Sequence, residues 1–176
     1  LNANHLPFEL DCTSAPFGTL RAHVARANPV WRNCDPDLDA LVVFQGAQAY
    51  ISPSWYPTKK ENGRAVPTWN YMVVHAFGRV RAIDDAAWLH ALLEQQSARY
   101  EAGRPQPWKI DDAPADYIEK MLAALVGIEI RITRLIGKWK VSQNQPQVNR
   151  AGVEQGLRDD GGEQAIAMAD AVARHR

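Results

Sequence analysis

The sequence lacks the features that mark exported and membrane-spanning proteins. It has only two cysteines, Cys12 and Cys34, and its apolar runs are a handful of residues long, too short for a transmembrane helix. No charged segment, apolar segment and cleavage site open the chain, so we expect no signal peptide. We therefore expect a cytoplasmic protein with free thiols and no membrane partner.

Short nucleotide and metal motifs are also missing. The chain contains no G-x-G-x-x-G, no G-x-x-x-x-G-K-[ST], no C-x-x-C and no H-E-x-x-H. Its five histidines are scattered, so a metal site would have to be assembled from distant segments. We expect no standard phosphate loop, no metal and no nucleophile elbow of the G-x-S-x-G kind.

The chain carries no net charge. Its 20 Lys and Arg balance 20 Asp and Glu, whereas proteins that bind nucleic acid through phosphates usually have a basic surplus. With 176 residues, of which 46% are hydrophobic and 23% charged, it has the composition of one globular domain that buries its own core. Since it begins at Leu1 rather than Met, we expect an N-terminal piece to be absent.

The first half of the chain is patterned as strands. Short strands are expected over His5–Leu10 and, by alternation, over Thr19–Ala25. The apolar run Ala40–Phe44 predicts a buried strand that turns at Gly46 into a hairpin with Ala49–Ser52.

A longer strand and two helices follow. Residues 67–83 are expected to form one strand with a bulge or barrel corner at Gly78. Helices are expected over 86–102, after a capping aspartate, and over 115–126, ended by Gly127.

The last part of the chain is predicted as a strand and a helix. Apolar and polar residues alternate over Ile128–Thr133, which predicts a strand, with the apolar residues at even-numbered positions. The apolar Trp139 is at an odd-numbered position, so we expect a bulge at Gly137 that shifts the alternation by one residue. Residues 151–174 are expected to be helical, with a weak break at two consecutive glycines. Five or more strands with short connections predict a mainly β or α+β fold, an antiparallel sheet or small barrel with appended helices.

Two tracts of the sequence are basic and contain no acid. Between Cys12 and Cys34 there are three arginines, and between Ile130 and Val153 there are five basic residues. Such tracts in a neutral chain suit a local anion site. The alternative is that basic strands simply face solvent.

Three segments within or near these tracts carry the candidate site residues. In the first, arginine forks and an asparagine amide suit a phosphate; the residues are Arg21, His23, Arg26 and Asn28. In the second, Pro67–Tyr71, aromatics around an asparagine suit a flat ring and its polar edge. The third, Gly137–Asn144, is too polar to bury unpaired. Each segment also has a purely structural interpretation. The first would be a turn at the rim of a barrel, the second a strand of the core, and the third an exposed strand end.

These segments resemble the PaiB-type family, whose members are described as FMN-binding negative transcriptional regulators. The resemblance extends over roughly residues 3–157. Its blocks are Gly18–Trp31, Phe44–Pro57, Val66–His75 and Gly137–Asn144.

The resemblance implies an FMN-binding split barrel, an antiparallel Greek-key barrel that works as a homodimer with two flavin sites at the subunit interface. It implies a split-barrel domain over residues 1–157 and a helical tail over 158–176. Because family members have a helix and a strand ahead of the block at Ala3–Phe8, the first barrel strand is expected to precede this sequence.

The resemblance also assigns residues to the cofactor. Those matching the phosphate-binding strands are His23, Arg26 and Asn28, with Arg21 nearby. Those expected to reach the flavin from the partner subunit are Thr68, Trp69, Asn70, Lys140, Ser142 and Gln143. Related oxidases carry a Ser-Arg-Lys run, whereas this chain has Ala25-Arg26-Ala27 and no lysine there. No catalytic residue is assigned.

Three functions are compatible with these residues. The first is a flavin-binding homodimer that acts as a negative transcriptional regulator, with DNA or another protein as a further partner. The second is an FMN-dependent oxidoreductase of the flavin reductase or pyridoxamine phosphate oxidase type. The third is a barrel without cofactor that serves as a binding module.

Overall fold

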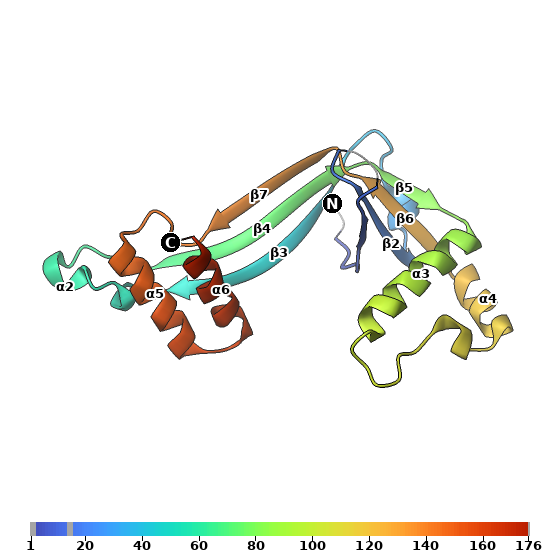
Figure 1. Cartoon of the computed structure of the whole chain (residues 1–176). Helices are drawn as coiled ribbons and strands as arrows, with labels where there is room; N and C mark the ends of the chain where they lie inside the picture. Colours follow the sequence, from blue (N-terminus) through green and yellow to red (C-terminus); the bar gives the residue numbers. More distant parts are fainter. Residues whose placement is uncertain (1–2, 14–15, 176) are drawn as a thin grey trace. The chain divides into compact units, whose positions relative to one another are not determined.

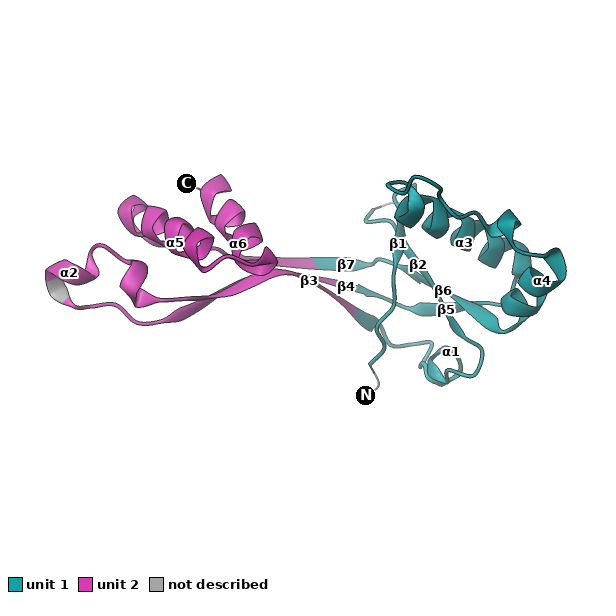
Figure 2. Cartoon of the chain, turned by 90° about the horizontal axis from the view of Figure 1, so that it is seen from below, with its two compact units in different colours: residues 1–41, 76–135 teal, residues 42–75, 136–176 magenta. Residues whose placement is uncertain are grey.

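The computed structural model describes residues 3–13 and 16–175, which divide into two compact units (Figure 2). Unit 1 comprises residues 1–41 and 76–135, and unit 2 comprises residues 42–75 and 136–176. The expected α+β class with antiparallel sheets is confirmed. Within the described ranges the strands form two open sheets, one of four strands and one of three, and no closed barrel.

Unit 1 is built on the four-stranded sheet. Its strands are, in spatial order, β1 (Glu9–Asp11), β2 (Thr19–Ala25), β6 (Leu125–Arg131) and β5 (Val80–Ile83), and each neighbouring pair is antiparallel. The alternation expected of β2 is confirmed, because alternate residues of β2 and β6 pair on one buried face. That face consists of Leu20, Ala22, Val24, Val126, Ile128 and Ile130.

The helices of unit 1 lie mainly between β5 and β6 in the sequence (Figure 1). They are α1 (Val30–Asn33), α3 (Ala86–Glu101), the 3-10 turn η2 (Ile110–Asp112) and α4 (Ala115–Ala123). The Asp85 side chain caps α3 by accepting a hydrogen bond from the Trp88 backbone N–H at 2.9 Å. Helix α3 packs against β2 and β6.

Unit 2 is built on most of the three-stranded sheet. The sheet order is β3 (Ala40–Ile51), β4 (Thr68–Gly78) and β7 (Arg134–Lys140), and the arrows in Figure 1 run antiparallel. Helices α5 (Gln147–Asp160) and α6 (Glu163–Arg174) pack against each other. Between β3 and β4 lie the 3-10 turn η1 (Pro53–Trp55) and α2 (Lys59–Asn62).

The core of unit 2 lies where these helices meet the sheet. Ile51 of β3 and Val141, just after β7, are fully buried with residues of α5 and α6. The helical contribution comprises Val153, Leu157, Met168, Ala169, Ala171 and Val172. Trp55 of η1 packs against this core, and its ring lies directly over Gly156 of α5. The loop that contains Trp55 is therefore anchored to the helices.

Two expectations about glycine are wrong, for one physical reason. Gly46 does not turn a hairpin, because β3 runs unbroken past it; it lies against Met72 of β4. Gly127 does not end α4 but lies within β6, where a Cβ would collide with the Trp88 ring. Gly137 lies within β7, close to the Trp139 ring, and the bulge expected there remains a prediction. Each glycine serves close packing rather than a turn.

Other boundaries also differ from expectation. The strand expected over 67–83 is divided at Arg79 into β4 and β5, which belong to different sheets. The chain therefore changes sheet directly after Gly78, where a corner was expected. The first strand begins at Glu9 rather than His5. The strand expected to continue from Ile128 to Trp139 is two strands: β6 ends at Arg131, and β7 begins at Arg134 in the other sheet. Helix α5 passes through Leu157, and the domain boundary expected there remains a prediction.

Both cysteines are free thiols. None of the helices within residues 3–13 and 16–175 combines the length and the apolar composition needed to cross a membrane.

Candidate functional site

A cavity of about 190 Å³ lies at one end of the sheet of unit 2. Four of the ten residues selected from the sequence line it: Thr68 and Asn70 from the start of β4, and Lys140 and Ser142 from the end of β7. The remaining lining residues are Tyr56, Val66, Pro67, Asn144 and Gln145. Residues some 70 positions apart in the sequence therefore converge because β4 and β7 are sheet neighbours.

Lys140 brings a positive charge to the cavity. Its Nζ donates a hydrogen bond to Thr68 Oγ1 at 2.6 Å. The Lys140 side chain is exposed, and among the residues that the structure describes no carboxylate forms an ion pair with it. An ammonium group beside a hydroxyl is well suited to an anionic or carbonyl oxygen of a ligand.

Asn70 is the buried polar residue of the cavity. It is 0% exposed, and its Nδ2 donates to Ser142 Oγ at 2.9 Å. Its Oδ1 is buried and has no hydrogen-bond partner. A buried acceptor without a partner costs about 1–3 kcal/mol, so a hydrogen-bond donor of a ligand in the cavity would stabilise it.

Ser142 has an unusual backbone conformation. Its φ of 62° is the positive φ recorded for a non-glycine residue in the described part of the chain. Such backbone strain costs about 1–3 kcal/mol and clusters at ligand sites. Gln143 supports the turn: its Oε1 accepts from the Val141 N–H at 2.8 Å, and its Nε2 donates to the Trp139 carbonyl at 2.6 Å. Gln143 thus shapes the strand end rather than lining the cavity.

The structure also differs from the sequence-based expectation at Trp69 and Tyr56. Trp69 points away from the cavity, donating through Nε1 to Gln48 Oε1 at 3.1 Å and lying edge to face with Tyr50 at 6.5 Å between ring centroids. Tyr56, which was not selected, lines the cavity, and burial raises the pKa of its hydroxyl. The feature of the sequence that pointed to Tyr56 is the pair of aromatic residues in the loop over residues 52–57.

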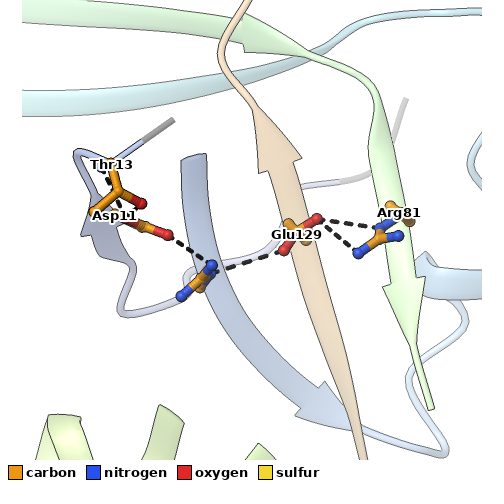
Figure 3. Close-up of polar contacts among 5 residues, drawn as sticks. Asp11, Thr13, Arg81 and Glu129 are labelled. Carbon is orange, nitrogen blue, oxygen red and sulfur yellow. Dashed lines mark hydrogen bonds and ion pairs between the residues drawn. The ribbon is translucent and has the colours of Figure 1, made fainter. Parts of the chain in front are cut away.

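Arg21 of unit 1 belongs to a chain of charges across the four-stranded sheet (Figure 3). Its Nη2 lies 2.6 Å from Asp11 Oδ2, and its Nε lies 3.8 Å from Glu129 Oε2. Glu129 also pairs with Arg81 at 3.0 Å. Hydrogen bonds from Thr13, together with Arg21, lower the pKa of Asp11. The Arg21 guanidinium is therefore already neutralised by carboxylates of neighbouring strands.

Arg26 is even more fully engaged. It makes two hydrogen bonds to Asp84, at 3.0 and 2.6 Å, and donates to the carbonyls of Ala123 and Leu125 at 2.7 and 2.9 Å. These bonds from Arg26 lower the pKa of Asp84. Arg26 thus ties the end of β2 to the start of α3 and to the turn before β6.

Asn28 and His23 complete the set from unit 1. Asn28 forms a turn, accepting from the Val30 N–H at 2.9 Å and donating to Asn4 Oδ1 at 2.8 Å. His23 is half-buried, its Nδ1 has no hydrogen-bond partner, and burial lowers its pKa below 6.5. The four residues therefore occupy separate local arrangements rather than one pocket of unit 1.

Comparison with known proteins identifies the family. Residues 1–134 match the family model described as "Putative FMN-binding domain". The match includes Thr68 and Asn70 but stops before Lys140 and Ser142. The chain is 33% identical to protease synthase and sporulation protein PAI 2 of Bacillus subtilis, over 96% of this chain and 78% of that protein. It is 32% identical to an uncharacterized protein of Aspergillus fumigatus, over 98% of this chain and 82% of that protein.

A solved structure is also similar. The FAD and heme binding protein from Mycobacterium smegmatis has a TM-score of 0.49 and 17% identity to this chain. The alignment covers 69% of this chain and 53% of that protein, so the chain spans about half of its length. From the family match and the identity to PAI 2, this chain belongs to the PaiB-type family of FMN-binding domains, which confirms the family and the flavin cofactor expected from its sequence.

Proposed function

We propose that this chain binds FMN in the cavity of unit 2 and acts as a homodimeric, flavin-binding negative transcriptional regulator. The observation that carries the flavin site is the buried, unpartnered Oδ1 of Asn70 in a cavity that also offers the Lys140 ammonium. FMN has both hydrogen-bond donors and acceptor oxygens, so it can satisfy each of these groups. When bound, FMN supplies redox chemistry and a visible absorption.

The donor set fits FMN, but the cavity is small. Its 190 Å³ is less than the roughly 300–1,000 Å³ of pockets that enclose a whole drug-sized ligand. The cavity therefore accommodates part of FMN, and other protein groups must enclose the remainder. As the family resemblance implies, Arg21, His23, Arg26 and Asn28 of one chain remain our candidates for the phosphate of a flavin whose ring is held in the cavity of the partner chain. A phosphate has to compete there with Asp11 and Asp84, which already pair with the two arginines.

An apolar surface on unit 2 supports pairing of two chains. Tyr50 of β3 and Trp69 of β4 are about half exposed, at 50% and 49%. By strand alternation they lie opposite the fully buried Ile51 and Asn70. Figure 2 shows α5 and α6 together on one side of the strands. Exposed neighbouring aromatics are typical of protein interfaces, and a second copy of this chain would cover them.

The regulatory role rests on the family resemblance and on the relative PAI 2, whose name refers to protease synthesis and sporulation. The formal net charge of zero does not favour direct binding to DNA through phosphates. Regulation through a protein partner is equally compatible with these residues.

Titration of the purified chain with FMN tests the site. We expect saturable binding that Lys140→Gln weakens about tenfold, because it removes a charged donor from the cavity. Lys138→Gln is the matched control: Lys138 lies on the same strand, is exposed and is not part of the cavity lining. Equal loss in both variants would reduce the role of Lys140 to general electrostatics, and absence of saturable binding would refute the flavin site.

A further inference from the structure

The cavity of unit 2 presents a pattern of hydrogen-bonding groups rather than positive charge alone. Asn70 Oδ1 is an acceptor, is completely buried and has no partner. The same cavity also contains donors: the Ser142 hydroxyl, which accepts from the Asn70 amide at 2.9 Å, and the Lys140 ammonium beside the Thr68 hydroxyl. The cavity therefore combines one fixed, buried acceptor with several donors.

This pattern is unsuited to a phosphate. A phosphate at neutral pH presents acceptor oxygens almost exclusively, and an unpartnered amide oxygen would face them with its own lone pairs. Leaving both acceptors buried without donors would be costly. The phosphate of FMN is therefore expected to lie elsewhere.

The pattern does match one edge of the flavin ring. The pyrimidine part of isoalloxazine presents an N–H at N3 between two carbonyls, which is an acceptor, donor, acceptor sequence. Tyr56, Val66 and Pro67 add apolar surface to the same cavity, and a flat ring buries its faces against such side chains. The N3–H is a donor that cannot rotate away, so it suits a fixed buried acceptor.

Resting on the FMN site proposed above, we infer that Asn70 selects the flavin by accepting a hydrogen bond from N3–H of the isoalloxazine ring. The hydroxyls of Thr68 and Ser142 and the ammonium of Lys140 then donate to the carbonyl oxygens on either side. Asn70 is a specificity-determining residue, and the cavity recognises the imide edge of the ring.

Binding of FMN and of its N3-methyl derivative to the wild-type full chain tests this inference. The methyl group removes the N3–H donor and leaves the phosphate, the ribityl chain and the carbonyls unchanged. We expect the N3-methyl derivative to bind at least tenfold more weakly, because Asn70 Oδ1 then remains buried without a donor. Flavin fluorescence measures both affinities, and the comparison requires no substitution in the buried strand.

A variant then attributes the discrimination to Asn70. Asn70→Leu has similar volume but no acceptor, and we expect it to bind FMN more weakly while reducing the discrimination to about twofold or less. If the wild-type chain binds both flavins equally, the inference is overturned while the FMN site stands. Equal discrimination in wild type and Asn70→Leu would also overturn it. Failure of the wild type to bind either flavin would refute both the inference and the proposed site.

Discussion

Arg26 illustrates how a residue can carry a motif and still serve the fold. Its position after a strand and before Asn28-Pro29 suggested a phosphate ligand. In the structure its guanidinium contacts Asp84 and two backbone carbonyls, those of Ala123 and Leu125. Sequence shows which residues can donate hydrogen bonds, but not which partners the folded chain brings to them.

This arrangement predicts that Arg26 stabilises the cofactor-free protein. We expect Arg26→Ala to lower Tm without FMN, because two carbonyls lose their donor and Asp84 loses its cation. Arg32→Ala is the control: Arg32 is exposed and lies over the Trp31 ring at 4.4 Å, so its loss should leave Tm nearly unchanged. Thermal unfolding monitored by circular dichroism measures both, and an unchanged Tm for Arg26→Ala would mean that the residue is free to serve a ligand alone.

Among the elements, the contact between η1 and α5 determines the position of the cavity's aromatic wall. A Cβ at Gly156 would lie 2.5 Å from Cγ of Trp55, and Tyr56 follows directly. Glycine in a helix normally costs about 1 kcal/mol relative to alanine. Here the close approach of the indole ring reverses that preference.

We therefore expect Gly156→Ala to destabilise the chain by about 1–2 kcal/mol through overpacking and to weaken FMN binding by displacing Tyr56. Gly103→Ala is the matched control, since no atom lies within 4 Å of a Cβ built there; its effect should stay within about 0.5 kcal/mol. Urea denaturation measures the two free energies of unfolding. A stabilised Gly156→Ala protein would contradict the packing described.

The elements also show what periodicity can and cannot predict. The alternation of β2, the capped start of α3 and the break between α5 and α6 were predicted because local patterns determine them. The errors at Gly46 and Gly127 arose because a glycine in a turn and a glycine under a side chain look alike in sequence. Only the neighbouring strand or ring distinguishes them.

For the molecule as a whole, the sequence predicted about half of the cavity. Thr68, Asn70, Lys140 and Ser142 were selected from two polar segments, and the structure brings them together. That these segments meet depends on the pairing of β4 with β7, which no local pattern specifies. For the same reason, the sequence did not show that Arg21 and Arg26 pair with carboxylates from other strands and turns.

The central claim is that a pair of chains carries flavin. Sedimentation velocity of the protein with FMN, followed at the visible absorption of the flavin, tests it directly, because only species that carry flavin are detected. We predict one sedimenting species with twice the chain mass of 19.7 kDa and one flavin per chain. Flavin that stays with the unbound small molecule, or that sediments with a single chain, would contradict the account.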